Sequence, residues 1–194
     1  MKAFLRVALR DFLKVGAVLP SSRYAARRIV ALAPRQCKMV VEYGAGNGAI
    51  TRALLWSPVL APNGILIAIE QNAEFCRALR AIPDPRLKVY EGDVATFCNR
   101  FLLSGKRADL IVSGIPFSFL SPAARKTLLR KAYSILCRGG VFIVYQHSPL
   151  LAGYLKDIFG NVQRSVEWRN FPPYVVMRSA KMLSQDDKFS TAFC

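Results

Sequence analysis

Short apolar runs alternate with helical patterns along most of the chain. Five runs rich in Val, Ile and Leu predict buried strands at 39–43, 65–70, 87–90, 109–112 and 141–145. Helices are predicted at 49–55, 73–80, 122–136 and 150–159, and the third starts at a proline and stops at the Gly139-Gly140 pair. Two further stretches, 162–168 and 174–181, predict a closing antiparallel hairpin. The sequence therefore predicts a doubly wound α/β fold with a seven-stranded, mostly parallel sheet buried on both faces.

The first 34 residues have a different pattern, in which basic and apolar positions interleave. At about 100° per residue, one helical face collects apolar side chains, and the other collects Lys2, Arg6, Arg10 and Lys14. This N-terminal amphipathic helix has the pattern of a helix lying in a lipid interface, with its cations at anionic headgroups. The pattern also fits a helix that packs on its own sheet. We divide the chain into a basic segment, 1–34, and a folded domain, 35–194.

Composition changes the picture mainly through charge. The chain has 28 Lys and Arg against 12 Asp and Glu, a formal net charge of +16. This excess predicts a polyanionic partner, either nucleic acid or an anionic membrane surface. The five cysteines are scattered and His147 is the single histidine, so neither a disulfide framework nor a metal site is predicted. Without an apolar membrane span or a secretory signal pattern, we expect a cytoplasmic protein.

A glycine-rich turn follows the first predicted strand, with the sequence Glu42-Tyr43-Gly44-Ala45-Gly46-Asn47-Gly48. Glycines are needed where the backbone turns sharply and a ligand lies against it. Glu70 ends the second strand, where a carboxylate binds ribose hydroxyls, and Asp93 follows the third. These positions predict an adenosine-type cofactor. The turn also satisfies a dinucleotide fingerprint, but Glu42 suits a positively charged ligand better than a pyrophosphate.

This turn resembles the first motif of the class I S-adenosylmethionine-dependent methyltransferases, E/D-x-G-x-G-x-G, at every fixed position. The resemblance implies S-adenosylmethionine as the cofactor. It also implies that Glu42 and the turn hold the methionine part, that Glu70 binds the ribose, and that Asp93 binds the adenine. The implied cofactor-binding set is Glu42, Gly44, Ala45, Gly46, Gly48, Glu70, Gln71, Asp93, Val94 and Ser113.

The fourth predicted strand ends in Ser113-Gly114-Ile115-Pro116-Phe117, and in this fold that loop faces the methyl group. Enzymes that methylate base amines carry [N/D/S]-[P/I/L]-P-[Y/F/W] here, and this loop is close to the pattern but has an inserted glycine. A second match, Asn170-Phe171-Pro172-Pro173-Tyr174, lies between the last two strands. We interpret it as a proline-stiffened hairpin connection.

These stretches, with 4–6 and the G-A-V-x-P-S-S pattern at 16–22, resemble the bacterial phospholipid N-methyltransferases and their ornithine-lipid relatives. The resemblance covers nearly the whole chain. It implies methylation of a lipid amine, with phosphatidylethanolamine as the first acceptor and ornithine lipid as the alternative. The layout also resembles the ribosomal RNA adenine dimethyltransferases, so an RNA acceptor stays open, as does a membrane-binding domain without catalysis.

The expected acceptor chemistry assigns roles to several residues. The carbonyl groups of Ser113 and Gly114 would accept hydrogen bonds from the N–H groups of the amine, and Tyr24 or His147 would relay its proton. A trimethylated product is a bulky cation, which favours a pocket with aromatic walls. The candidates for these walls are Tyr24, Phe117, Tyr145 and Tyr174, although core packing is expected for Tyr145. The substrate- and membrane-contacting set is Lys2, Arg6, Arg10, Lys14, Arg23, Phe117 and Tyr174. We expect a monomer bound peripherally to the inner face of the cell membrane.

Overall fold

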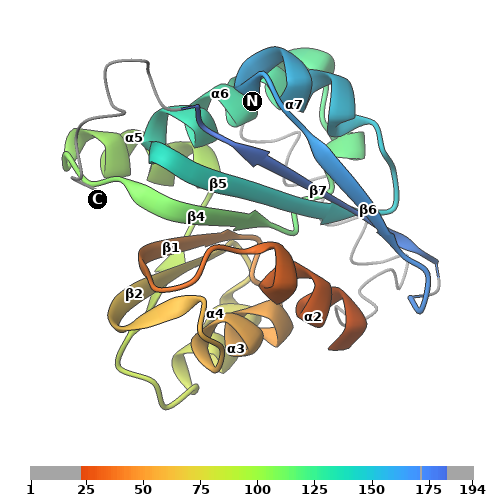
Figure 1. Ribbon diagram of the computed structural model, residues 1–194. Coiled ribbons are helices and arrows are strands. Elements are labelled where there is room, and N and C mark those ends of the chain that lie inside the picture. Colours follow the sequence, from red (N-terminus) through yellow and green to blue (C-terminus); the bar gives the residue numbers. More distant parts are fainter. Residues whose placement is uncertain (1–22, 171, 183–194) are drawn as a thin grey trace.

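A seven-stranded sheet forms the centre of the computed structural model, which describes residues 23–170 and 172–182 (Figure 1). The strand order is β3-β2-β1-β4-β5-β7-β6. The strands are β1 Cys37–Tyr43, β2 Leu60–Glu70, β3 Leu87–Glu91, β4 Ala108–Ser113, β5 Leu136–Gln146, β6 Gln163–Glu167 and β7 Tyr174–Ala180. Strands β1 to β5 pair in parallel, whereas β7 is antiparallel to both β5 and β6. The predicted sheet and its closing hairpin are confirmed.

Helices cover both faces of this sheet (Figure 1). On one face lie α2 Arg23–Leu32, α3 Ala49–Leu55 and α4 Ala73–Arg80; on the other lie α5 Val94–Leu103, α6 Pro122–Ile135 and α7 Leu151–Phe159. Neighbouring residues on a strand face opposite sides, so a strand covered on both sides must be apolar throughout. Val40 therefore packs toward the first set of helices, and Val41 packs toward the second.

Two strands begin earlier than the sequence predicts. β2 starts at Leu60, which pairs with Cys37 before the register shifts, and Gly64 lies in this irregular part. β5 follows α6 directly, so the Gly139-Gly140 pair lies inside the strand and does not end the helix. The pairing of β4 with β5 is irregular in the same region. The prolines and glycines that predict turns here mark irregular strand pairing instead.

One helix, α5, has no counterpart in the predicted elements. Its ten residues mix β-branched and aromatic side chains, which give a weak helical signal. Asp93 caps its first turn, because the carboxylate accepts a hydrogen bond from the Thr96 amide at 2.9 Å. Asp93 is thus a local signal for the start of this helix, which its interpretation as a ligand-binding residue does not include.

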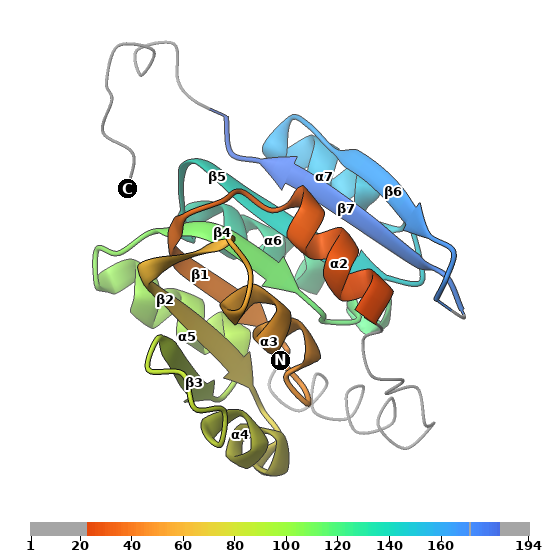
Figure 2. The same ribbon diagram turned by 60° about the horizontal axis from the view of Figure 1, so that its bottom comes forward.

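The described part of the basic segment is α2. It buries Ala25, Ala26 and Ile29 against the sheet and lies beside the β5–β7–β6 half (Figure 2). Arg178 of β7 donates from Nε to the carbonyl of Leu32 at 3.0 Å, which fixes the end of the helix. This helix thus packs on its own sheet. The predicted interface helix with Lys2, Arg6, Arg10 and Lys14 lies outside the described residues.

Residues 23–170 and 172–182 contain neither a membrane-spanning helix nor a metal-binding cluster. No helix in these ranges is long and apolar enough to cross a membrane. Within the same ranges, no cluster of three or more His, Cys, Asp or Glu side chains could hold a metal ion.

Candidate active site

Strands β1 to β6 end at one edge of the sheet, which we call the carboxyl edge. Tyr43 of β1 pairs with Ile69 of β2 on one side and with Ser113 of β4 on the other, and Ser113 pairs with Val144 of β5. The loops after these strands are therefore neighbours. We call the loops after β1, β2 and β3 the cofactor half, and those after β4, β5 and β6 the acceptor half. Ligands of doubly wound sheets bind at this edge.

The glycine turn is fixed to β2 at its start and open at its middle. The amides of Gly44 and Ala45 both donate to the carbonyl of Ile69, at 2.9 and 3.1 Å. Gly46 has a φ of 54°, and a Cβ atom placed there would meet no other atom within 4 Å. Gly48, by contrast, is packed, because a Cβ there would lie 3.0 Å from the Leu79 side chain. A ligand therefore has access to the backbone at Gly46.

Glu70 holds the turn and the following loop together. One carboxylate oxygen accepts a hydrogen bond from the Gly46 amide at 2.8 Å. The other accepts from the amides of Gln71 and Asn72, at 2.7 and 2.9 Å. Each carboxylate oxygen has about two lone-pair sites, so the Gly46-bonded oxygen keeps acceptor capacity for a ligand hydroxyl. The predicted ribose residue is thus also the support of the glycine turn.

Glu42 lies beneath the turn with half of its carboxyl group unsatisfied. The side chain is 1% exposed, and Oε2 accepts a hydrogen bond from the Thr51 hydroxyl at 2.6 Å. Oε1 is buried without a hydrogen-bond partner among the described residues. Burial raises the pKa of Glu42 to about 8, the Thr51 bond lowers it, and the charge of Glu70 raises it further. A cation beside this group would favour its ionised form.

Asp93 and Val94 complete the cofactor half in the predicted order along the edge. Both carboxylate oxygens of Asp93 contact Thr96, one through the amide and one through the hydroxyl. Val94 is 5% exposed and belongs to the core beside α5. The predicted adenine contact of Asp93 therefore has to coexist with its role as a helix cap.

In the acceptor half, the backbone after β4 lies directly beside the glycine turn. The Gly114 amide donates to the Tyr43 carbonyl at 2.9 Å, and the Ser113 hydroxyl accepts from the Ile115 amide at 3.3 Å. Phe117 does not line this site, because its side chain is fully buried in the core that includes α6 and α7. Phe119, 51% exposed, is the exposed aromatic residue of the same loop.

Tyr174 lies in the acceptor half as part of an aromatic stack. Its ring packs edge-on against Tyr145 at a centroid distance of 5.6 Å and face-on against His147 at 4.3 Å. Nδ1 of His147 lies 3.0 Å from the carbonyl oxygen of Pro173. The connection between β6 and β7 is thus held against the end of β5. The sequence predicts a hairpin connection here, but the contact of this connection with β5 depends on the sheet order and has no local signal.

Tyr24 and Arg23 lie at the start of α2, beside the same connection. Arg23 donates to the Tyr24 hydroxyl at 2.9 Å, and the Arg169 guanidinium lies 4.7 Å from the Tyr24 ring centroid. These bonds and charges lower the pKa of Tyr24, with Arg23 as the largest cause. Arg169 also makes two hydrogen bonds to Glu167, at 2.7 and 2.8 Å, which tie the connection to this position. The relay of a proton by Tyr24 stays a prediction.

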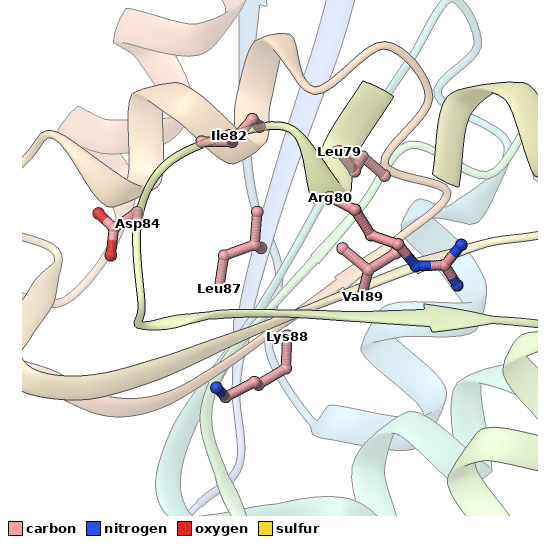
Figure 3. Close-up of a pocket in the computed structure, with 7 residues that line it drawn as sticks. All are labelled: Leu79, Arg80, Ile82, Asp84, Leu87, Lys88 and Val89. Atoms are coloured by element: carbon pink, nitrogen blue, oxygen red, sulfur yellow. The ribbon is translucent and has the colours of Figure 1, made fainter. Parts of the chain in front are cut away.

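A separate pocket of about 270 Å³ lies between α4 and β3 (Figure 3). Its lining includes Leu79 at the end of α4, Ile82 just after that helix, and Leu87 and Val89 from β3. No predicted site residue lines this pocket. It therefore adds nothing to the site at the carboxyl edge.

No family model matches the chain, but individual proteins are similar to it. An ornithine lipid N-methyltransferase from Singulisphaera acidiphila is 29% identical over 164 residues, which cover 82% of this chain and 84% of that protein. The N-methyltransferase NodS from Bradyrhizobium japonicum WM9 superposes with a TM-score of 0.69 at 16% identity, covering 86% of this chain and 99% of that one. The chain is a class I S-adenosylmethionine-dependent methyltransferase.

Two further comparisons bear on this methyltransferase. The 1,6-didemethyltoxoflavin-N1-methyltransferase of Burkholderia thailandensis, solved with bound S-adenosylhomocysteine, superposes with a TM-score of 0.68 at 19% identity over 94% of this chain and 89% of that one. Ribosomal RNA small subunit methyltransferase A of Methylococcus capsulatus is 32% identical over 96 residues. That match covers 48% of this chain and 35% of the relative, so the chain spans about a third of that protein's length.

The residues at the cofactor half fit S-adenosylmethionine, the cofactor of this enzyme. The orphaned Oε1 of Glu42 offers a buried acceptor for a cationic ligand, and Gly46 leaves open space beside the backbone. Glu70 retains acceptor capacity for hydroxyl groups. These three features match the positive charge and the ribose of this cofactor.

Proposed function

We propose that this methyltransferase transfers a methyl group to the amine nitrogen of a membrane-lipid headgroup. The relative that supports this proposal is the ornithine lipid N-methyltransferase, because its match extends over 82% of this chain and 84% of that protein. A match of this length includes the loops after β4 and β5 as well as the cofactor turn. The amine of ornithine lipid is the acceptor that this relative favours, and phosphatidylethanolamine is the acceptor expected from the sequence.

An amine must be neutral before its nitrogen attacks. A primary alkyl amine has a pKa near 10 in water, so it is mostly protonated at pH 7. Desolvation at the acceptor half would lower that pKa. The carbonyl groups of Ser113 and Gly114 would accept hydrogen bonds from the amine N–H groups and so orient the nitrogen. S-adenosylmethionine supplies an electrophilic methyl group on a sulfonium. The protein then contributes mainly position and dryness.

The acceptor half also carries the side chains expected of an edge that faces a membrane. Trp168, directly after β6, is 75% exposed. Arg23 and Arg27 of α2 and Arg169 of the connection add positive charge around Tyr24. Aromatic side chains favour the headgroup region, and basic ones favour anionic lipids. Since a lipid amine stays at the bilayer surface, docking through this edge would bring it to Gly114.

A ribosomal RNA acceptor is the second candidate. It is favoured by the 32% identity to ribosomal RNA small subunit methyltransferase A and by the net charge of +16. That similarity extends over only 35% of the relative, whereas the lipid enzyme matches along 84% of its length. We therefore place RNA second.

The test supplies purified protein and radiolabelled S-adenosylmethionine with three acceptors: vesicles of ornithine lipid, vesicles of phosphatidylethanolamine, each with an anionic lipid, and ribosomal RNA. We expect chloroform-extractable label from at least one type of vesicle, and the mobility of the product on a chromatogram counts the methyl groups. Label in only one lipid identifies the headgroup. Label confined to RNA would overturn the lipid proposal.

A further inference from the structure

The Tyr145 side chain lies across the acceptor loop at the position that Gly114 leaves empty. The paired row Tyr43, Ser113 and Val144 is followed on the three strands by Gly44, Gly114 and Tyr145. A Cβ atom on Gly114 would lie 2.5 Å from the Tyr145 hydroxyl oxygen and 3.2 Å from the Gly44 carbonyl oxygen. The hydroxyl therefore lies against the acceptor loop, at the point where this loop meets the start of the glycine turn.

Packing fixes this hydroxyl in place. Tyr145 is 8% exposed and its ring meets Tyr174 at an interplanar angle of 81°. Tyr174 is in turn stacked on His147 at 19°, and the His147–Pro173 contact holds that stack against the β6–β7 connection. Rotation of the Tyr145 ring would disturb its contact with Tyr174, which these other contacts hold in place. A polar atom at the acceptor loop is thus held by an apolar, close-packed support.

A phenol hydroxyl both donates and accepts hydrogen bonds, so it can accept one N–H of a neutral amine. If the second N–H group donates a hydrogen bond to a backbone carbonyl of the loop, the orientation of the nitrogen lone pair is fixed. We propose that Tyr145 binds the acceptor amine through its hydroxyl and so sets the direction of attack, with Tyr174 and His147 as positioning residues. This inference rests on the proposed function, since it requires an amine acceptor.

The proposal makes the importance of Tyr145 depend on how far methylation has gone. A neutral primary amine has two N–H bonds, its monomethyl product has one, and its dimethyl product has none. The hydroxyl therefore guides the first transfer most and the last transfer least. A residue with a merely structural role would affect all three transfers equally.

The experiment compares Tyr145→Phe with wild type on vesicles of the unmethylated and the dimethylated forms of the labelled lipid. We expect the variant to lose about tenfold in kcat on the primary amine and less than twofold on the dimethylated amine, with unchanged binding of S-adenosylmethionine. The control is Tyr133→Phe on α6, whose ring packs on Phe159. It should change neither rate.

Equal losses on both lipids, or no loss, would overturn the role of Tyr145. If wild type labels only RNA, the lipid proposal fails separately, and the same comparison is made on RNA with adenosine or N6-methyladenosine at the labelled position. A larger loss on adenosine would then support the role of Tyr145, and an equal loss on both would overturn it.

Discussion

The two halves of the carboxyl edge are built in different ways. In the cofactor half, a carboxylate binds backbone amides: Glu70 accepts from its chain neighbours Gln71 and Asn72, and from Gly46 in the loop after the adjacent strand β1. In the acceptor half, side chains from distant positions meet: Tyr145 of β5 contacts Tyr174 of β7 and reaches Gly114 after β4. Hydrogen bonds to one carboxylate shape the cofactor half, and packing of aromatic side chains shapes the acceptor half.

This difference predicts how each half responds to mutation. A change in the cofactor half should remove cofactor binding and stability together, because the same carboxylate serves both. A change in the acceptor half should spare cofactor binding and alter turnover. The following substitutions test this separation, beginning with the largest expected effect.

Glu70→Ala should have the largest effect. It leaves three backbone amides of the turn and the following loop without their acceptor. We expect the free energy of unfolding to fall by about 2–4 kcal/mol and the affinity for S-adenosylmethionine to fall at least about 100-fold. Urea unfolding and calorimetric titration measure the two quantities. The control is Glu74→Ala in α4, the helix that follows this loop. The Glu74 side chain is 81% exposed, so both quantities should stay unchanged.

Gly114→Ala should come next and should act on turnover alone. The added Cβ would lie 2.5 Å from the Tyr145 hydroxyl, which is held by Tyr174. We expect kcat to fall about 30-fold while the affinity for S-adenosylmethionine changes less than about threefold. Steady-state rates and calorimetry provide the comparison. Gly153→Ala on α7, where a Cβ meets no atom within 4 Å, is the matched control.

A double variant sharpens this test. Removing the hydroxyl in Gly114→Ala/Tyr145→Phe relieves the closest contact, so the double variant should be no slower than Gly114→Ala. If the two losses multiply instead, Gly114 and Tyr145 act independently.

Glu42→Gln should remove a pH dependence of cofactor binding, which we expect to be about tenfold in affinity between pH 6 and 8. Burial raises the pKa of Glu42 to about 8, so the group is mostly protonated at pH 7. A bound cation lowers that pKa, and binding therefore releases a proton and strengthens as the pH rises from 6 to 8. Calorimetry in buffers of different ionisation enthalpy counts the protons. Subtracting the Glu42→Gln value removes those from the cofactor's own amine, and no difference would contradict this role.

The same substitution has a consequence for folding. The pKa of Glu42 in the folded protein lies above its ordinary value of 4.5. Its contribution to stability is therefore complete below about pH 4.5 and is lost as the pH rises through about 8. Glu42→Gln should unfold at a temperature that depends less on pH over this interval.

The comparison also explains what the sequence could predict. The strands, the glycine turn and the acidic residues at or near the ends of β1, β2 and β3 follow from local patterns, and the sheet order brings these strand ends side by side. Phe117 shows where local pattern fails. An aromatic residue after Pro116 fits the acceptor motif, but its side chain turns into the core that includes α6 and α7. The direction of a loop side chain depends on the helix packed above it.

Tyr145 shows the opposite failure. Its place on a strand predicts a core residue, and it is indeed 8% exposed. Its hydroxyl nevertheless reaches Gly114, because β4 and β5 are neighbours and the loop at that point has no side chain. Tyr174 contacts Tyr145 because β7 pairs antiparallel to β5, which brings the start of β7 to the end of β5. None of these contacts could be predicted without the strand order.

The smallest expected effect separates the two edges of the sheet. Trp168 follows β6 at the carboxyl edge and is 75% exposed; Trp56 precedes β2 at the opposite edge and is 68% exposed. Both can be replaced by serine without loss of core contacts. We expect Trp168→Ser to weaken binding to anionic vesicles about fivefold and Trp56→Ser to leave it unchanged, because only the first would lie at the headgroups.

Vesicle co-sedimentation at low and high salt measures this difference. Salt should weaken vesicle binding of both variants and of wild type alike, because it screens the charges of the basic side chains and not the apolar contact of the indole. The ratio between wild type and Trp168→Ser should therefore persist at high salt. If Trp56→Ser loses as much affinity as Trp168→Ser, the membrane does not meet the acceptor half preferentially. A lipid amine would then have to reach Gly114 in another way, and the docking orientation proposed above would be wrong.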